Sequence, residues 1–294
     1  MTTATMTSDA DSGDTAEEPV ITRDPMAGAH PPGRRSPKEL LAAAKEFQKE
    51  SRARSWFHLF ETMGVFALLT ALIVLAPTWL SIAWPLQLAL AVINGLVVVR
   101  WFIVYHDYMH NAILRGSALA KWLMYAFGVY VMVPPNVWRQ THNYHHAHTA
   151  KIVGSHVGSY LMVTTDMYKQ MSPKERLMYR IYRNPLVVFF AYFTVFFYGM
   201  CVSSFLRNPR KNWDSALAAV LNVVANVAIF AAFGWQLWLF AFFLPLFVAT
   251  MAGAYLFYVQ HNYPEMHVQP RDTWEYTRAA LESSSYFESG PIMA

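Results

Sequence analysis

Long apolar segments with almost no charged residues constrain this fold more than any other feature of the sequence. They lie at about 56–76, 86–105, 119–133, 186–206, 216–233 and 235–258. The hydrocarbon core of a bilayer is about 30 Å thick, so a helix needs about 20 apolar residues to cross it. Only 14% of the 294 residues are charged, against about 25% in soluble domains. The sequence therefore predicts an all-α integral membrane protein.

The basic residues indicate how the segments are oriented. Seven Lys and Arg lie in 34–54, nine lie between Arg115 and Arg183, and three follow the 186–206 segment. The turns around 77–85 and Gly234 carry none. Because cytoplasmic loops are enriched in Lys and Arg, we expect the three basic regions to be cytoplasmic, in a bacterial inner membrane.

Two transmembrane hairpins follow from this pattern, formed by the first two and the last two apolar segments. The 119–133 segment is short and is followed by Pro134 and Pro135, so we expect it in the membrane interface. His106, His110, His142, His145, His146 and His261 lie before and after the 186–206 segment. If these histidines are to share one side of the membrane, this segment must be re-entrant or interfacial. The prediction is two helical hairpins, further interfacial or re-entrant helices and a His-rich cytoplasmic cap.

The N-terminal part has two predicted regions. Residues 1–35 are polar, with no basic segment followed by an apolar one, and we expect a disordered leader rather than a secretory signal. Ser36-Pro37-Lys38-Glu39 is typical of a capped helix start. The helix is expected to run to about Arg54 along the membrane surface, and residues 36–294 to form one membrane domain.

Histidines are grouped at helical spacing. His106 and His110 are i,i+4, and His142, His145 and His146 are i, i+3 and i+4, so each group lies on one helix face. Neutral imidazole is a common ligand of iron, copper and zinc. Buried together without a metal, these rings would leave costly unpaired polar groups. The two groups therefore predict a metal centre.

The remaining residues narrow the choice of metal. The single cysteine, Cys201, excludes an internal disulfide and a Cys-ligated iron–sulfur cluster. The sequence has no HExxH motif, which argues against a zinc protease. Many His and few carboxylates favour iron that handles dioxygen, with copper a poorer fit. His148 lies at the edge of its group and is a spare or supporting candidate. Asp107 either orients a neighbouring imidazole or is a solvated helix-end charge.

The order of these motifs resembles the integral-membrane fatty acid desaturases. The residues that carry the resemblance are His106-x-x-x-His110, Trp138-Arg139-x-x-His142-x-x-His145-His146, Tyr258-Val259-Gln260-His261 and the segment from Trp274 to Glu282. The lead-in from Val99 to Asp107 is similar to the acyl-lipid (Δ12/ω6-type) branch. The resemblance covers roughly residues 40–290.

The resemblance implies a non-haem di-iron centre that uses O₂ to remove two hydrogens from adjacent methylenes of a lipid-linked acyl chain. The implied iron ligands are His106, His110, His142, His145, His146 and His261. The family carries a third HxxHH cluster shortly after the Trp274–Glu282 segment, and the 294 residues do not contain it. We therefore expect a truncated sequence or a degenerate relative whose second iron is poorly held.

Other functions remain open at this stage. A related membrane hydroxylase or ketolase uses a similar His-rich site, and an inactive relative is a third possibility. Electrons are expected from an external ferredoxin or cytochrome-type donor that docks on the basic stretch Lys169–Arg183, although these charges also suit anionic lipid headgroups. The expected partners are thus an acyl lipid, the bilayer and this donor, with no nucleic acid.

Overall fold

The computed structural model describes residues 36–151, 160–263, 266, 268–269 and 272–285. The predicted leader at 1–35 lies outside these residues. All extended regular elements in the described part are helices, apart from an isolated bridge between Lys151 and Gln269. The prediction of an all-α fold is confirmed.

The first two apolar segments form an antiparallel hairpin of α2 (Arg52–Trp79) and α3 (Trp84–Met109). Both helices are long and apolar enough to cross a membrane. Polar groups inside the hairpin bond to each other, since Gln87 donates to the Ile73 carbonyl at 2.9 Å and Asn94 donates to Thr70 Oγ1 at 3.0 Å. These bonds fix how the two helices face each other in a region where unpaired polar groups are costly.

The last two apolar segments form a second hairpin, of α10 (Trp213–Leu237), η3 (Trp238–Phe243) and α11 (Leu244–Val259). The chain reverses at Gly234, whose φ of 78° is in the region that favours glycine. The apolar stretch Trp213–Val259 has 47 residues, which would be roughly 70 Å long as a straight helix. Folding at Gly234 gives two arms, as the sequence predicted.

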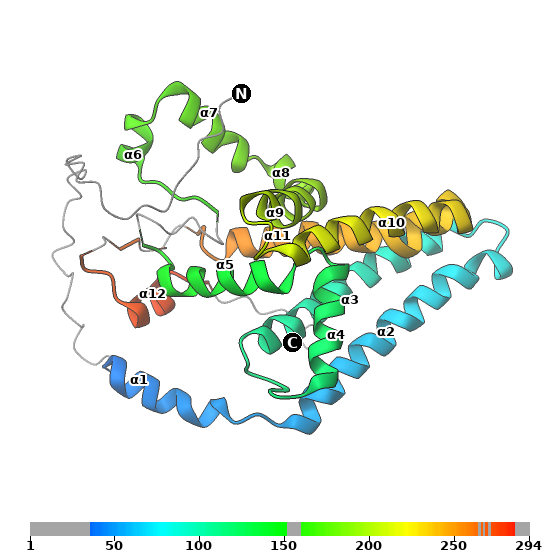
Figure 1. The fold of residues 1–294 in the computed structure, drawn as a ribbon, viewed down its shortest axis with the longest axis horizontal. Helices are drawn as coiled ribbons and strands as arrows, with labels where there is room; N and C mark the ends of the chain where they lie inside the picture. Colours follow the sequence, from blue (N-terminus) through cyan, green and yellow to red (C-terminus); the bar gives the residue numbers. More distant parts are fainter. Residues whose placement is uncertain (1–35, 152–159, 264–265, 267, 270–271, 286–294) are drawn as a thin grey trace.

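The two hairpins pack through α3 and α11. Gly95 permits a close approach, because a Cβ there would lie 2.7 Å from Val248 Cβ and 2.9 Å from the Pro245 carbonyl oxygen. At the turn end, Gln236 donates to Gln87 Oε1 at 2.7 Å. Figure 1 shows both hairpin turns at the right-hand end of the molecule, with the ends of α3 and α11 that approach the histidines toward the other end.

Two shorter helices come between the two hairpins in the sequence. The helix α4 (Ala118–Tyr130) has 13 residues, roughly 20 Å of length, which is too short to cross a bilayer. Next comes α5 (Pro135–His148), which begins at the second of two prolines. In Figure 1, α4 runs steeply across the molecule, whereas α5 runs in nearly the same direction as the second hairpin.

The 186–206 segment is broken into α8 (Pro185–Phe189), the wide helix η2 (Tyr192–Ser203) and α9 (Ser204–Arg207). It is not among the spans long enough to cross a membrane in the described residues. The Tyr192 hydroxyl donates to Asn222 Oδ1 at 2.9 Å, which ties it to α10. This is the segment that the sequence predicted not to span.

The N-terminal helix differs from the prediction. The capping box of Ser36 and Glu39 is present, and α1 (Pro37–Ala44) continues as η1 (Lys45–Gln48). The helix does not run on to Arg54, because Lys49 and Ser51 are extended and α2 begins afresh at Arg52. Glu50 instead accepts the Leu114 N–H at 2.6 Å, which holds the break against the loop after α3.

Three further helices complete the described part. They are α6 (Thr165–Gln170), α7 (Pro173–Tyr182) and α12 (Tyr276–Glu282). Figure 1 shows α6 and α7 as a pair beyond the main helices, with α12 beside the far end of α5.

Candidate metal centre

Three helices bring the six predicted histidines together. His106 lies in the last turn of α3 and His110 follows it directly, while α5 carries His142, His145 and His146. His261 follows α11, two residues after its last helical residue. The two groups predicted from spacing, and the late histidine implied by the resemblance, are therefore neighbours in space.

Four of these rings form one cluster. The candidate ligand atoms of His106, His110, His142 and His146 all lie within 4.8 Å of one another. His142 Nε2 is 3.0 Å from His106 Nε2 and 3.0 Å from His146 Nε2. The fourth ring is that of His110, 4.8 Å from the His146 ring between centroids. We call these residues the four-histidine cluster.

The geometry of this cluster suits a metal ion better than hydrogen bonds alone. A neutral imidazole nitrogen offers either one N–H or one lone pair, yet His142 Nε2 faces two other ring nitrogens. His110 Nε2 is buried and has no hydrogen-bond partner among the described residues. Metal–nitrogen bonds are about 2.0–2.1 Å long, so two ligands at right angles lie roughly 3 Å apart. The observed spacing fits such ligands.

The other two histidines form a separate pair. His145 Nε2 is 3.0 Å from His261 Nε2, and the ring of His145 is 5.6 Å from that of His146. Because residues 145 and 146 are about 100° apart on the helix, one faces α11 and the other faces α3. The pair is thus a second candidate site beside the first, with two histidines from the described residues.

Burial keeps the rings neutral. Desolvation, followed by the neighbouring imidazoles, lowers the pKa of His142 to about 2, of His145 to about 3 and of His146 to about 4. The pKa of His110 and that of His261 are also lowered, in both cases mainly by desolvation. A neutral ring keeps the lone pair that a metal needs.

Hydrogen bonds on the outer nitrogens orient two of the rings. Asp107 Oδ1 is 3.0 Å from His106 Nδ1, so this carboxylate contacts the imidazole, as one of the two sequence readings proposed. The Ser283 carbonyl accepts from His261 Nδ1 at 2.7 Å. An acceptor on Nδ1 holds the proton there and turns Nε2 toward the site.

Sequence reasoning missed Ser283, because a backbone carbonyl 22 residues away leaves no signal in side-chain patterns. It also missed how the rings are packed. Trp138 stacks on His142 at 4.1 Å between ring centroids, one helical turn earlier on α5. Phe257 lies 5.2 Å from the ring of His145. The i,i+4 spacing of Trp138 and His142 was the available clue.

His148 lies away from the cluster. Its Nδ1 is 2.9 Å from the Tyr144 carbonyl oxygen, and its ring stacks on Tyr144 at 3.9 Å. The structure therefore gives this residue a local partner on its own helix.

A cavity of about 680 Å³ opens beside the four-histidine cluster. Its lining residues are His106, His110, Asn143, His146, Ala147, Trp274 and Tyr276. The segment around α12 thus forms one wall of the access to the cluster.

Comparison with known proteins gives this site a context. The chain is 29% identical over 255 residues to a protein of Bacillus subtilis named "Fatty acid desaturase", covering 85% of this chain and 70% of that protein. It is 24% identical to an sn-1 acyl-lipid omega-3 desaturase (ferredoxin) of Nostoc sp., covering 78% of this chain and 64% of the relative. It is also 24% identical to an sn-1 oleoyl-lipid 12-desaturase of Synechocystis sp., covering 82% and 67%.

The chain thus spans about two thirds of the length of these relatives. The family model described as fatty acid desaturase matches residues 82–290, which include all six histidines of the site. With the sequence motifs, the apolar hairpins and the clustered imidazoles, this match shows that the chain belongs to the fatty acid desaturase family.

Proposed function

We propose that this protein is a membrane desaturase that introduces a double bond into a lipid-linked acyl chain, with O₂ and electrons from an external donor. The observation that carries the proposal is the convergence of six imidazoles from three helices at one end of two apolar hairpins. Family membership gives the reaction class, and the hairpins give access to a substrate that resides in the bilayer.

In this proposal the four-histidine cluster holds iron, and His145 with His261 contributes to a second iron. Bound iron would supply the redox chemistry needed to oxidise an unactivated C–H bond, which acid–base groups cannot attack. The chain's own residues position the ligands. Asp107 and the Ser283 carbonyl hold the outer nitrogens, while Trp138 and Phe257 pack against the rings and limit access of water.

The two sites are unequal in the chain studied. One site has four histidines whose candidate ligand atoms lie within 4.8 Å of one another, and the other has two histidines among the described residues. We therefore propose that the first binds iron tightly and that the second holds it weakly unless further ligands are supplied.

The names of the relatives suggest the electron donor and the substrate. The Nostoc protein is named as an acyl-lipid desaturase that uses ferredoxin, and the Synechocystis protein is named as an oleoyl-lipid desaturase. On this basis we propose an acyl lipid as the substrate and a ferredoxin as the donor. Within the basic stretch Lys169–Arg183, Arg183 turns inward to Asn262 Oδ1 at 2.6 Å. Lys174 and Arg180 stay exposed on α7 and are available to an acidic donor.

Fatty-acid profiling tests this function. The chain would be expressed with a ferredoxin and its reductase in a bacterial host of known acyl composition, beside the His142→Gln variant. A new C=C in lipid acyl chains, absent with the variant, is the expected result. Retained oxygen on the chain would indicate a hydroxylase or ketolase instead. Unchanged lipids from an iron-loaded, donor-supplied chain would indicate an inactive relative.

A further inference from the structure

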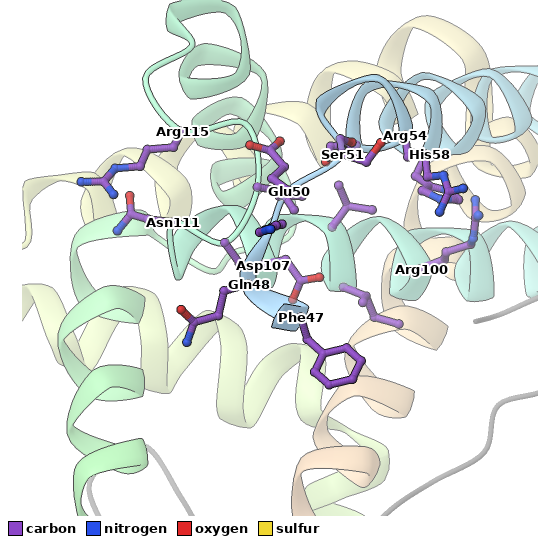
Figure 2. A pocket seen from close by; sticks show the side chains of 16 residues that line it. Phe47, Gln48, Glu50, Ser51, Arg54, His58, Arg100, Asp107, Asn111 and Arg115 are labelled. Atoms are coloured by element: carbon purple, nitrogen blue, oxygen red, sulfur yellow. Dashed lines mark hydrogen bonds between the residues drawn. The ribbon is translucent and has the colours of Figure 1, made fainter. Parts of the chain in front are cut away.

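A second cavity, of about 710 Å³, lies beside the C-terminal half of α3 (Figure 2). It is bounded by the break before α2, by the last turns of α3 and by the loop that follows. Figure 2 shows Arg54, His58 and Arg100 on one side of it and Arg115 with Asn111 on the other. None of the six histidines lines it.

Long-range hydrogen bonds assemble this cavity. Glu50 Oε1 accepts the Leu114 N–H at 2.6 Å, and Arg52 donates to the Arg115 carbonyl at 3.1 Å. Each bond joins residues more than 60 positions apart. The break between η1 and α2, which the sequence did not predict, is therefore fixed against the loop after α3 and forms a wall of the cavity.

The charges that line the cavity are unbalanced. Four cationic side chains (Lys49, Arg54, Arg100 and Arg115) face two carboxylates, Glu50 and Asp107. Both carboxylates have other contacts, since Glu50 binds the Leu114 N–H and Asp107 contacts His106. Arg100 is paired with Glu61 and Thr62. The charged groups of Lys49, Arg54 and Arg115 have no partner among the described residues, which leaves an excess of positive charge.

Apolar side chains complete the lining. Phe47 is 82% exposed and Ile103 is 43% exposed, and both border the cavity. Figure 2 shows the Phe47 ring at its edge, close to the end of η1. A ligand that satisfies the whole site needs an anionic group for the guanidinium groups and an apolar part for these side chains. Guanidinium groups bind phosphate oxygens through several hydrogen bonds at once.

We propose that this cavity binds the phosphate of an anionic phospholipid headgroup, next to the end of the helix that carries His106 and His110. The proposal rests on the proposed function only in taking the bound lipid as a substrate. One lipid molecule would place its phosphate in the cavity that Arg54 and Arg115 line from opposite sides, and its acyl chains along the apolar faces of α2 and α3. Asp107, which borders the cavity and contacts His106, connects the headgroup site to the metal centre.

Native mass spectrometry of the detergent-solubilised full chain tests the site without requiring turnover. Titration with phosphatidylglycerol should show one tightly held lipid per chain. Diacylglycerol with the same acyl chains lacks the phosphate and should bind at least about tenfold more weakly. Equal binding of the two lipids by the unmodified chain would overturn the proposal.

Variants then locate the binding. Arg54→Gln with Arg115→Gln should weaken phosphatidylglycerol binding by about tenfold or more, whereas Arg54→Lys with Arg115→Lys should retain most of it. The matched control is Arg210→Gln with Lys211→Gln, which removes the same charge from an exposed loop elsewhere. Binding that is unchanged in the first double variant, or weakened equally in the control, would contradict the assignment.

A competition arm separates the two sources of phosphate. Millimolar inorganic phosphate should not displace the lipid, because it lacks the apolar part, and displacement would identify a free-phosphate site instead. Double-bond formation is measured in a separate assay on the same purified proteins. A chain that binds the lipid here but forms no double bond would support the headgroup site and contradict the proposed function. A chain that forms the double bond but does not bind the lipid here would support the function and contradict the headgroup site.

Discussion

At the scale of single residues, the position of His142 favours a metal site over a set of packed rings. Its Nε2 faces the Nε2 atoms of both His106 and His146 at 3.0 Å, and Trp138 covers its ring. Burial lowers the pKa of His142 to about 2, so the ring presents a lone pair over the whole working range of pH. Losing this ring removes the centre of the four-histidine cluster.

His142→Gln is therefore expected to lower iron content several-fold, because an amide is a poor substitute for an imidazole ligand. His148→Gln is the matched control on the same helix, since His148 contacts Tyr144 instead. Elemental analysis of the purified variants makes the measurement. Equal iron content in both would remove His142 from the site.

Much at this scale could be predicted from spacing. His106 with His110, and His142 with His145 and His146, share helix faces at i+3 and i+4 separations, and both groups meet in the structure. The division of the six histidines into a cluster of four and a pair could not be predicted. It depends on where the end of α11 lies, because adjacent residues on a helix point in different directions.

At the scale of elements, the helix α5 is held at its start by a residue of the second hairpin. The helix begins at Pro135, directly after Pro134, and no side-chain cap of its own is present. Asp214, 5% exposed, accepts the Asn136 N–H at 2.8 Å. A carboxylate at a helix N-terminus satisfies a free N–H and interacts favourably with the helix dipole. The candidate ligands on α5 are thus anchored to α10.

Asp214→Ala should destabilise the protein by about 1–3 kcal/mol, because it leaves the half-buried Asn136 N–H unpaired, and it should also reduce iron retention. Asp214→Asn keeps an acceptor oxygen and should restore most of both. Thermal unfolding in detergent and iron content are the two measurements. An alanine variant that matches the parent in both would show that α5 does not depend on this contact.

Close packing between the hairpins gives a second prediction at this scale. Gly95→Ala places a Cβ 2.7 Å from Val248 Cβ, and overpacking of this kind costs about 1–3 kcal/mol. Gly64 in α2 has no atom within 4 Å of such a Cβ, so Gly64→Ala should be neutral or stabilising. Thermal unfolding compares them. Equal midpoints for the two variants would contradict the observed contact of α3 with α11.

The elements themselves were largely predictable from apolar runs, and the breaks less so. The turn at Gly234 was expected between the last two apolar segments, and the chain reverses there at a positive φ. The helix start at Ser36 was expected from its capping box. The break in the helix before Arg52 was not expected, because it depends on a hydrogen bond between Glu50 and a loop 64 residues away.

At the scale of the whole molecule, two hairpins place their turns at one end and the C-terminal ends of α3 and α11, near which His106 and His261 lie, toward the other (Figure 1). The outer faces carry exposed apolar side chains, such as Leu68 at 59% and Val227 at 63%. In water such faces would be unfavourable, whereas lipid covers them at no cost. Which end faces the cytoplasm was inferred from Lys and Arg alone and stays a prediction.

Cysteine labelling tests this orientation. Cys201 is fully buried, so background labelling should be low. Ser81→Cys, in the first hairpin turn, should react in intact cells with a charged maleimide that cannot cross the bilayer. Lys174→Cys on α7 should react only after permeabilisation. The reverse pattern would place the histidines on the outer side.

Iron binding by the intact chain tests the central claim most directly, which is that imidazoles from α3, α5 and α11 together hold the metal. X-ray absorption at the iron edge, combined with metal titration, should show one tightly bound iron coordinated mainly by imidazole nitrogen at about 2.0–2.1 Å. A second iron should be released more easily. A chain that binds no iron, or binds it without imidazole coordination, would contradict this account.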